Sequence, residues 1–250
     1  MQFTGFLWFV LMLLPLVFLQ RFLHREIQAV ILLVTRNIQL TIGLFSVLFF
    51  PGVFLHELSH FLMAKVLGVR TRGFSLIPQS LPDGRLQMGY VETEKSDIVR
   101  DSLIGLAPLI AGTTFVAYAG IFKFQLNDLW NLLRDGQVGS FWMGLGTLPG
   151  VPDFYLWFYL TFAVSSTMLP SESDRDAWLP LGLWIAALLA LAIASGAGTW
   201  MLTNLTPLLD DFLFSVALLF GFSNLLHIIL LFPFYGIHRL LVYILKVDVR

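Results

Sequence analysis

Two histidines and a glutamate stand within five residues of one another in an otherwise apolar stretch. The run PGVFLHELSHFLMA (residues 51–64) contains an HExxH motif whose ionisable members are His56, Glu57 and His60. On a helix, residues at positions i and i+4 share a face, so both imidazoles can reach one metal ion. Glu57 projects near the same ion and can take a proton from water there. The motif therefore predicts a hydrolytic metal site.

A single histidine inside a membrane is usually a packed, hydrogen-bonded residue, and we interpret His227 in that way. Three ionisable groups together require another explanation. Each costs on the order of 3 kcal/mol or more at the centre of a bilayer, so such a cluster calls for a compensating ion.

A catalytic zinc ion usually takes three protein ligands, so one ligand besides His56 and His60 must come from elsewhere in the chain. Two stretches offer carboxylates at a helix end. The first is FAVSSTMLPSESDRDAW (162–178), and the second is TNLTPLLDDF (203–212). The candidate side chains are Asp174 and Asp176 in the first stretch and Asp210 and Asp211 in the second.

The order of the apolar segments favours the first stretch. The HExxH helix and the 154–170 helix run in the same direction, which brings Asp174 to the end of the bundle that holds the motif. Asp210 and Asp211 fall on the opposite side, as carboxylates that favour a helix start. We therefore predict Asp174 as the third ligand of a single Zn²⁺. Asp176 remains the alternative, and a solvated loop role remains open for both.

The composition indicates the fold that must position these residues. Of the 250 residues, 57% are hydrophobic and only 12% are charged, whereas soluble domains carry about 25% charged residues. Several apolar runs approach the roughly 20 residues that a spanning helix needs. The sequence predicts an all-α polytopic membrane protein with about six transmembrane helices, near residues 3–20, 38–67, 103–122, 154–170, 179–199 and 211–234.

The remaining segments are shorter or more polar. Residues 21–39 and 235–250 each predict a separate amphipathic helix at the membrane interface. Residues 73–91 predict a small β-hairpin insertion at the membrane surface, because Leu86, Met88 and Tyr90 alternate with polar residues or glycine after a turn at residues 82–84. We expect one transmembrane domain over 1–250. Its catalytic core would cover about 40–180, between the N-terminal helix and interfacial segment 1–39 and the C-terminal helices of 181–250.

Charge and cysteine content narrow the possible functions. The net charge is −1 without any basic block, so the sequence predicts no nucleic-acid partner. There is no cysteine, which excludes disulfides and thiolate metal ligands within the chain. With a cytoplasmic N-terminus, the cytoplasmic loops hold 10 Lys and Arg and the other side holds 5. This bias predicts both termini and the active-site side in the cytoplasm, and the short chain favours a prokaryotic plasma membrane.

The chain resembles the site-2 protease family of intramembrane zinc metalloproteases over about residues 40–180. The resemblance rests on Pro51-Gly52 ahead of HELSH, on the hairpin after it and on Gly105-Leu106-Ala107-Pro108 in the next span. It also rests on the stretch from Ser166 through Pro170 to Asp174, where the family has an Asn-x-x-Pro…Asp-Gly element. Here serine stands at Ser166 in place of the asparagine, and Arg175 replaces the glycine.

The resemblance implies a protease that cleaves transmembrane segments of other membrane proteins within the lipid bilayer. Glu57 would deprotonate the attacking water and later protonate the leaving amine. The hairpin would bind unwound substrate as an added strand. Polar side chains would line a water channel to the ion: Ser59, Ser165, Ser166 and Thr167.

Two other functions stay open. One is a catalytically inactive metal-binding membrane protein with a regulatory role, although a binding site alone has no need of a base such as Glu57. The other is a metal or proton transporter with an intramembrane relay, although the chain lacks the internal repeats typical of transporters. The sequence specifies neither the substrate nor the oligomeric state.

Overall fold

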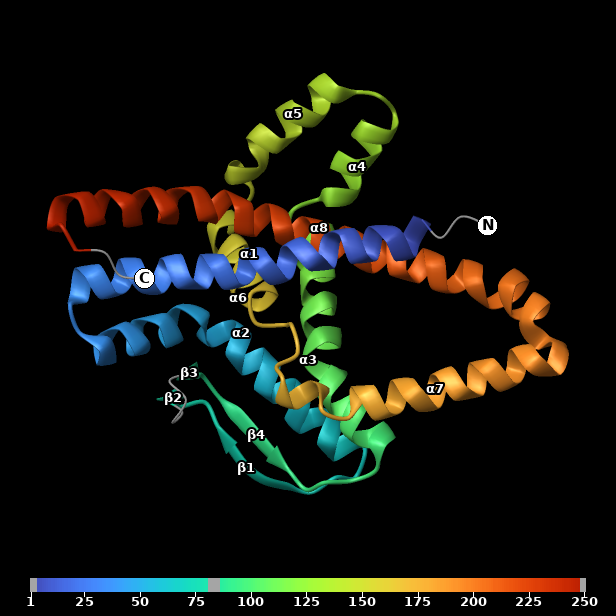
Figure 1. Cartoon of the computed structure of the whole chain (residues 1–250). Coiled ribbons are helices and arrows are strands. Elements are labelled where there is room, and N and C mark those ends of the chain that lie inside the picture. Colours follow the sequence, from blue (N-terminus) through green and yellow to red (C-terminus); the bar gives the residue numbers. More distant parts are fainter. Residues whose placement is uncertain (1–3, 81–85, 248–250) are drawn as a thin grey trace.

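The computed structural model of this chain is mainly helical and describes residues 4–80 and 86–247 (Figure 1). Eight α-helices are found in this part: α1 Thr4–Thr35, α2 Ile38–Val66, α3 Ile98–Tyr118, α4 Leu126–Arg134, α5 Val138–Thr147, α6 Phe154–Ser165, α7 Trp178–Ala192 and α8 Gly198–Leu245. Four short strands are β1 Thr71–Ser75, β2 Gln79–Ser80, β3 Leu86–Gln87 and β4 Tyr90–Thr93. Short 3₁₀ or π turns are η1 Ala119–Lys123, η2 Leu148–Gly150, η3 Ser173–Arg175 and η4 Ile193–Ala197.

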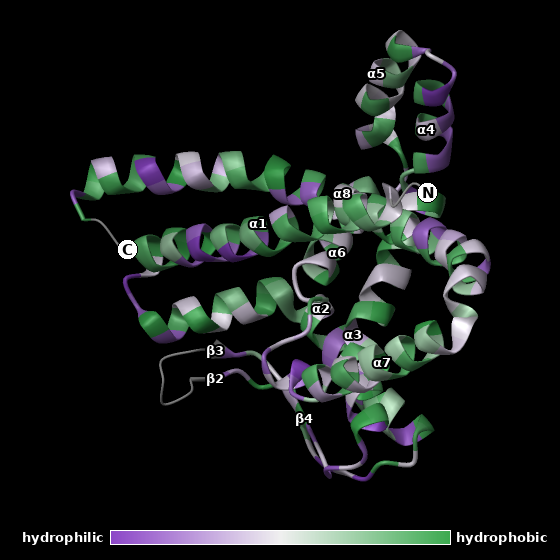
Figure 2. Ribbon diagram, turned by 45° about the vertical axis from the view of Figure 1, so that its right-hand side comes forward, coloured by the Kyte–Doolittle hydropathy of each residue, from purple (hydrophilic) through white to green (hydrophobic). Residues whose placement is uncertain are grey.

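Apolar surface dominates the long helices, as Figure 2 shows for α1, α2, α7 and α8. Among the described residues, four helical stretches are long and apolar enough to cross a membrane: Thr4–Thr35, Ile38–Val66, Ile98–Lys123 and Ser173–Leu245. The last stretch contains both α7 and α8, which reverse direction at Gly196, where φ is +92°. Glycine adopts this conformation readily because it has no Cβ. The apolar helix α6 is shorter, with 12 residues.

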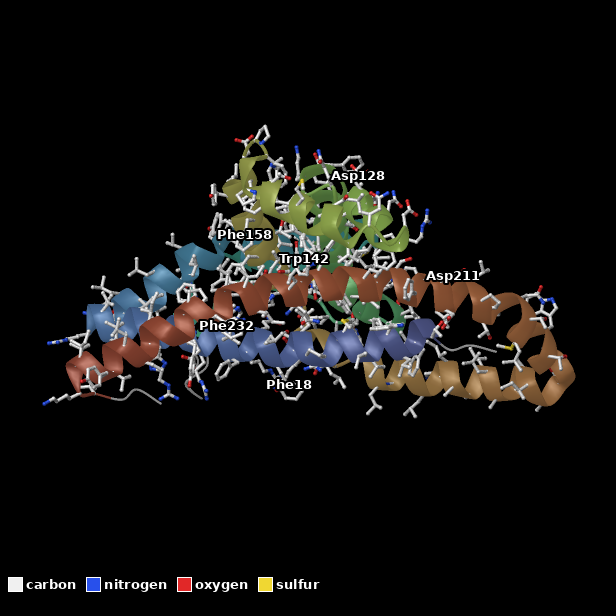
Figure 3. The ribbon with its side chains drawn as sticks, turned by 90° about the horizontal axis from the view of Figure 1, so that it is seen from above. Phe18, Asp128, Trp142, Phe158, Asp211 and Phe232 are labelled. Carbon is white, nitrogen blue, oxygen red and sulfur yellow. The ribbon has the colours of Figure 1, made fainter. Side chains whose placement is uncertain are left out.

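The helices α1 and α8 lie side by side and run in the same direction (Figure 1). Asn224 of α8 donates a hydrogen bond to the Met12 carbonyl (2.8 Å), and farther along both helices His238 Nδ1 lies 2.5 Å from Glu26 Oε2. Figure 3 shows the outer surface of this pair, where Phe18 and Phe232 are largely exposed. The first and last helices of the described chain therefore form one parallel unit.

Two predicted helix boundaries are wrong. The expected interfacial helix at 21–39 is the second half of α1, and the expected C-terminal helix at 235–250 continues α8 as far as Leu245. No glycine or proline interrupts α1 between Arg21 and Thr35. Its apolar stripe there is buried at helical spacing, at Leu23, Ile27 and Leu33. Leu23 and Ile27 belong to a core cluster with residues of α2 and α6, and residues of α8 pack against that cluster. The helix therefore continues into the bundle rather than turning onto a membrane surface.

Tight packing between α2 and α6 depends on one glycine. A Cβ added to Gly52 of α2 would lie 2.2 Å from the Ala163 carbonyl oxygen and 2.3 Å from Thr167 Oγ1, so no larger residue fits without displacement. Pro51, one residue earlier, is a proline inside α2, where a helix commonly kinks, and α2 is bent in Figure 1. A largely aromatic core cluster occupies this crossing: Leu23, Ile27, Phe45, Phe49, Val53 and Phe162.

The strands form two short antiparallel pairs between α2 and α3, β1 with β4 and β2 with β3. Phe74 pairs with Val91, and Ser75 pairs with Tyr90. The predicted hairpin is therefore present, although the strand is interrupted at Met88 and Gly89. The turn predicted at residues 82–84 lies outside the described residues.

Two further features lie at the two ends of α3. Asp97 caps α3 by accepting backbone hydrogen bonds from Val99 (3.1 Å) and Arg100 (3.0 Å), and the bond from Arg100 holds the pKa of Asp97 below its ordinary value. At the opposite end of α3, helices α4 and α5 form a projecting hairpin that the sequence analysis did not anticipate (Figures 1 and 3). Leu129 packs against Gly144 inside this hairpin, while Trp142 is exposed.

Candidate metal centre

The two histidines of the HExxH motif lie one turn apart on α2 and point their Nε2 atoms at the same space. The two Nε2 atoms are 3.2 Å apart. His60 is buried and His56 is partly buried. The i, i+4 spacing of the two histidines therefore brings two imidazole nitrogens within reach of one ion, as expected from the sequence.

The ring of His60 is oriented by α3. Its Nδ1 lies 2.8 Å from the Ile104 carbonyl oxygen, and because a carbonyl can only accept, Nδ1 carries the proton. This carbonyl is free because residue 108, four positions later, is a proline that has no N–H to donate. Pro108 in the Gly-Leu-Ala-Pro stretch thus supplies the acceptor that orients His60 and leaves its Nε2 for a metal.

The ring of His56 is oriented in the same way by the chain that follows α6. Its Nδ1 lies 2.6 Å from the Thr167 carbonyl oxygen and donates to it. The α-helix has ended by this point, at Ser165, and Pro170 follows within the next few residues. The last carbonyls of a helix have no intrahelical partner, so the Thr167 carbonyl is available for the histidine.

Asp174 enters the site from the short turn η3. Its Oδ1 lies 3.2 Å from His60 Nε2, and its Oδ2 lies 3.6 Å from His56 Nε2. The turn is held together at Ser171, whose N–H donates to Asp174 Oδ2 (2.7 Å) and whose carbonyl accepts from Arg175 Nε (3.0 Å). Arg175 therefore has a structural role at the position where the resemblance leads one to expect glycine.

One glycine allows this turn to approach α3. A Cβ added to Gly105 would lie 1.9 Å from the backbone oxygen of Asp174, a distance at which the turn or the helix must shift. Gly105 therefore sets the position of Asp174, while the Ile104 carbonyl beside it orients His60.

The three side chains could hold one metal ion. Ligand bonds of about 2.0–2.1 Å at tetrahedral angles separate ligand atoms by about 3.3 Å. The two Nε2 atoms are 3.2 Å apart, Asp174 Oδ1 lies 3.2 Å from His60 Nε2, and Asp174 Oδ2 lies 3.6 Å from His56 Nε2. One ligand atom from each residue lies within 4.8 Å of the others. In the neutral imidazoles both Nε2 atoms carry lone pairs directed at the same point, and a carboxylate faces them. A shared cation satisfies all three groups at once, and among the described residues this is the one such ligand group.

The other three candidate carboxylates do not lie with the two histidines. Asp176 is exposed at the end of η3 and does not belong to the ligand group. Asp210 accepts hydrogen bonds from the backbone N–H groups of Gly5 (2.8 Å) and Phe6 (3.2 Å), so it caps α1 rather than its own helix. Asp211 is exposed on α8, as Figure 3 shows.

Glu57 lies in the same cavity as the three ligand residues, and this cavity has a volume of about 1040 Å³. Its side chain is buried, and the strand segment that follows β3 covers it. A Cβ added to Gly89 would lie 2.9 Å from Glu57 Cγ and 3.1 Å from the Ser75 carbonyl oxygen. Gly89 therefore lets the hairpin approach the glutamate, which explains the interruption of the strand at this point.

The expected polar channel is only partly present. Ser166 and Thr167 line the cavity, whereas Ser59 and Ser165 do not appear in its lining, and their hydroxyls donate to carbonyls of their own helices. Sequence reasoning missed two cavity-lining residues of α1, Gln20 and His24. Their only sequence signal is polarity, which they share with Arg21, Arg25, Glu26 and Gln28 in the same part of α1. His227 is fully buried and hydrogen-bonded, as the sequence predicts.

Comparison of this chain with family models, with characterised proteins and with solved structures gave no match. The function must therefore be inferred from the residues and geometry of the site itself.

Proposed function

We propose that this protein is an intramembrane zinc metalloprotease that hydrolyses peptide bonds within or near transmembrane segments of other membrane proteins. One observation carries the proposal. The Nε2 atoms of His56 and His60 are 3.2 Å apart, each lies within 3.6 Å of a carboxylate oxygen of Asp174, and Glu57 lies in the same cavity. Two imidazoles, a carboxylate and a neighbouring glutamate are the parts of a hydrolytic zinc site.

The chemistry divides between the ion and the chain. Zinc, when bound, supplies a Lewis acid that makes water a nucleophile near neutral pH and polarises a carbonyl. Glu57 accepts the proton of the attacking water and returns it to the leaving amine. The carbonyls of Ile104 and Thr167 hold the two imidazoles in the tautomer that leaves Nε2 for the metal. Glu57 therefore moves the proton, and the other named groups hold the site in shape.

The substrate class follows from the cavity and its strands. A transmembrane helix exposes no free peptide carbonyls, so it must unwind before it can be cut. In the described part of the chain β4 pairs with β1 alone, and Tyr90 and Val91 of β4 line the cavity. We propose that an unwound substrate segment binds there as an added strand. The substitution Val91→Pro, which lies within β4, would exclude this role if it left cleavage unchanged.

The membrane arrangement belongs to the same proposal. We propose that α7 and α8 cross the membrane separately on either side of Gly196, with the active-site side facing the cytoplasm of a prokaryotic cell. Six alternating spans would put residues 4 and 245 on the same side. The parallel helices α1 and α8, if each crosses once, would instead put these residues on opposite sides, which requires an odd number of spans. The native chain has no cysteine, so a single cysteine introduced near each end would report its side by labelling.

The decisive test measures zinc content and cleavage in the same detergent-purified samples. We expect about one zinc per chain in the wild type, and cleavage of a model transmembrane substrate. Glu57→Ala should keep the zinc and lose cleavage by about 10²- to 10⁴-fold, because it removes general-base catalysis. Asp174→Ala should weaken zinc binding and abolish cleavage as a consequence.

Each alternative function has its own result in this experiment. Stoichiometric zinc without cleavage of any of several substrates would favour a metal-binding protein with a regulatory role. Absence of zinc from the wild type would contradict the proposal, because every step depends on the ligand group.

A further inference from the structure

Side chains of three other helices, α1, α2 and α8, form hydrogen bonds with the segment that follows α6. One of these hydrogen bonds orients the ring of His56. The Ser166 carbonyl has no helical partner because residue 170, four positions later, is a proline. This carbonyl accepts a hydrogen bond from the Gln20 side chain of α1. The next carbonyl, that of Thr167, accepts the hydrogen bond from His56 Nδ1 at 2.6 Å. Two consecutive carbonyls thus connect α1 and α2 to the same short segment.

The third connection comes from His227 of α8, a residue with no exposed surface. Its Nδ1 lies 2.8 Å from the Ser223 carbonyl oxygen, which can only accept, so Nδ1 carries the proton. Its Nε2 is then an acceptor, and the Ser166 hydroxyl donates to it at 2.9 Å. The Phe162 ring packs edge-on against the imidazole, with a centroid distance of 5.4 Å. The direction of the Ser166–His227 hydrogen bond is therefore fixed.

We propose that His227 is a positioning residue for the metal centre, acting through Ser166 and the peptide that follows it on the ring of His56. The inference rests on the proposed metal site. His227 accepts a hydrogen bond from the Ser166 hydroxyl and so fixes Ser166. The next residue is Thr167, whose carbonyl orients His56. Without this bond the buried hydroxyl has no partner there, and the carbonyl that holds the ligand ring is less well fixed.

A packing role alone would predict something different. Loss of side-chain volume at a buried histidine lowers the stability of the protein but has no specific effect on metal affinity. A positioning role predicts that removal of the hydrogen bond weakens metal binding even when volume is retained, and that removal of either partner has the same effect. Outer hydrogen bonds to metal ligands typically change metal affinity by about 10- to 100-fold.

The experiment measures Zn²⁺ affinity by competition with a chelator, and the visible absorption of the Co²⁺-substituted protein as a probe of ligand geometry. We expect Ser166→Ala and His227→Phe each to weaken Zn²⁺ binding by about 10-fold and to alter the Co²⁺ spectrum. The double variant should be no weaker than either single variant, because both remove one hydrogen bond. His227→Gln, whose amide oxygen can accept near the position of Nε2, should restore most of the affinity.

The matched control is Ser165→Ala, one residue earlier on the same helix. Its hydroxyl is also fully buried but bonds only its own helix, at the Phe162 carbonyl. This variant should leave the affinity and the spectrum unchanged. Unchanged values in Ser166→Ala together with zinc binding by the wild type would overturn this inference alone. Absence of zinc from the wild type would overturn the proposed metal centre and this inference with it.

Discussion

Proline has a specific role at this site, because it leaves a carbonyl free at a defined place. Pro108 leaves the Ile104 carbonyl to His60, and Pro170 leaves the Ser166 carbonyl to Gln20. Each proline stands four residues after the acceptor that it frees. Both prolines are visible in the sequence, but the side chains that use the freed carbonyls come from other helices. The sequence could therefore predict that His56 and His60 share one helix face, because their spacing is local, but not the groups that orient their rings.

The close approach between Gly105 and Asp174 can be tested by a single substitution. Gly105→Ala places a methyl group 1.9 Å from the Asp174 backbone oxygen, so the turn must move and carry Asp174, the proposed third ligand, with it. We expect zinc affinity to fall by about 10-fold or more, as for other disturbances of ligand orientation. Chelator competition on the purified protein measures this change.

The control for this substitution is Gly182→Ala on α7. A Cβ at Gly182 meets nothing within 4 Å, so the same change of residue type should leave zinc affinity unaltered. Equal affinities for Gly105→Ala and the wild type would mean that Asp174 does not depend on this close approach.

At the scale of helices, the pairing of α1 with α8 explains why the predicted boundaries failed. Hydropathy marks where apolar stretches occur, but a helix end is decided by capping and by what packs beside it. Residues 21–35 are amphipathic enough to suggest an interfacial helix. They bury Leu23, Ile27 and Leu33 in the bundle instead, and Glu26 meets His238 of α8. The sequence holds no local signal that these two helices are neighbours.

Asp210 tests the parallel pair directly. Its carboxylate accepts from the Gly5 and Phe6 N–H groups at the start of α1, 205 and 204 residues away in the sequence. Asp210→Ala should lower the free energy of unfolding by about 1 kcal/mol, the usual cost of losing an N-terminal cap. Thermal or denaturant unfolding in detergent micelles measures the difference.

Asp211→Ala is the natural comparison, because Asp211 is the next residue on α8 and is exposed. We expect its unfolding curve to superimpose on that of the wild type. If both variants unfold alike, Asp210 does not cap α1, and the contact between the starts of the two helices would need another basis.

The proposed metal centre brings together parts of the chain that are far apart in sequence. His56 and His60 lie on α2, Asp174 lies on η3, and the carbonyls that orient the rings belong to α3 and to the segment after α6. The predominantly helical fold and the small strand insertion were predictable from composition and periodicity. The projecting hairpin of α4 and α5 was not, because helices of 9 and 10 residues give only a short periodic signal.

Metal removal should therefore affect the stability of the whole molecule. A ligand that binds only the folded state at 100 times its Kd adds about 2.7 kcal/mol to the free energy of unfolding. We expect chelation of zinc to lower the Tm and re-addition of zinc to restore it. Asp174→Ala should show a much smaller response to the chelator, and an equal response in both proteins would place the relevant metal elsewhere.

The parallel pairing of α1 with α8 also has a consequence for biosynthesis. α1 is translated long before α8, so the contacts between these two helices form only after the intervening residues have been made. All three proposed metal ligands and Glu57 have been made once residue 174 has been translated. Asp210, which caps α1, and His227, which holds Ser166, are translated later. A chain truncated between residues 174 and 210 would therefore contain every ligand but lack the contacts from α8 that hold α1 and the end of α6 in place.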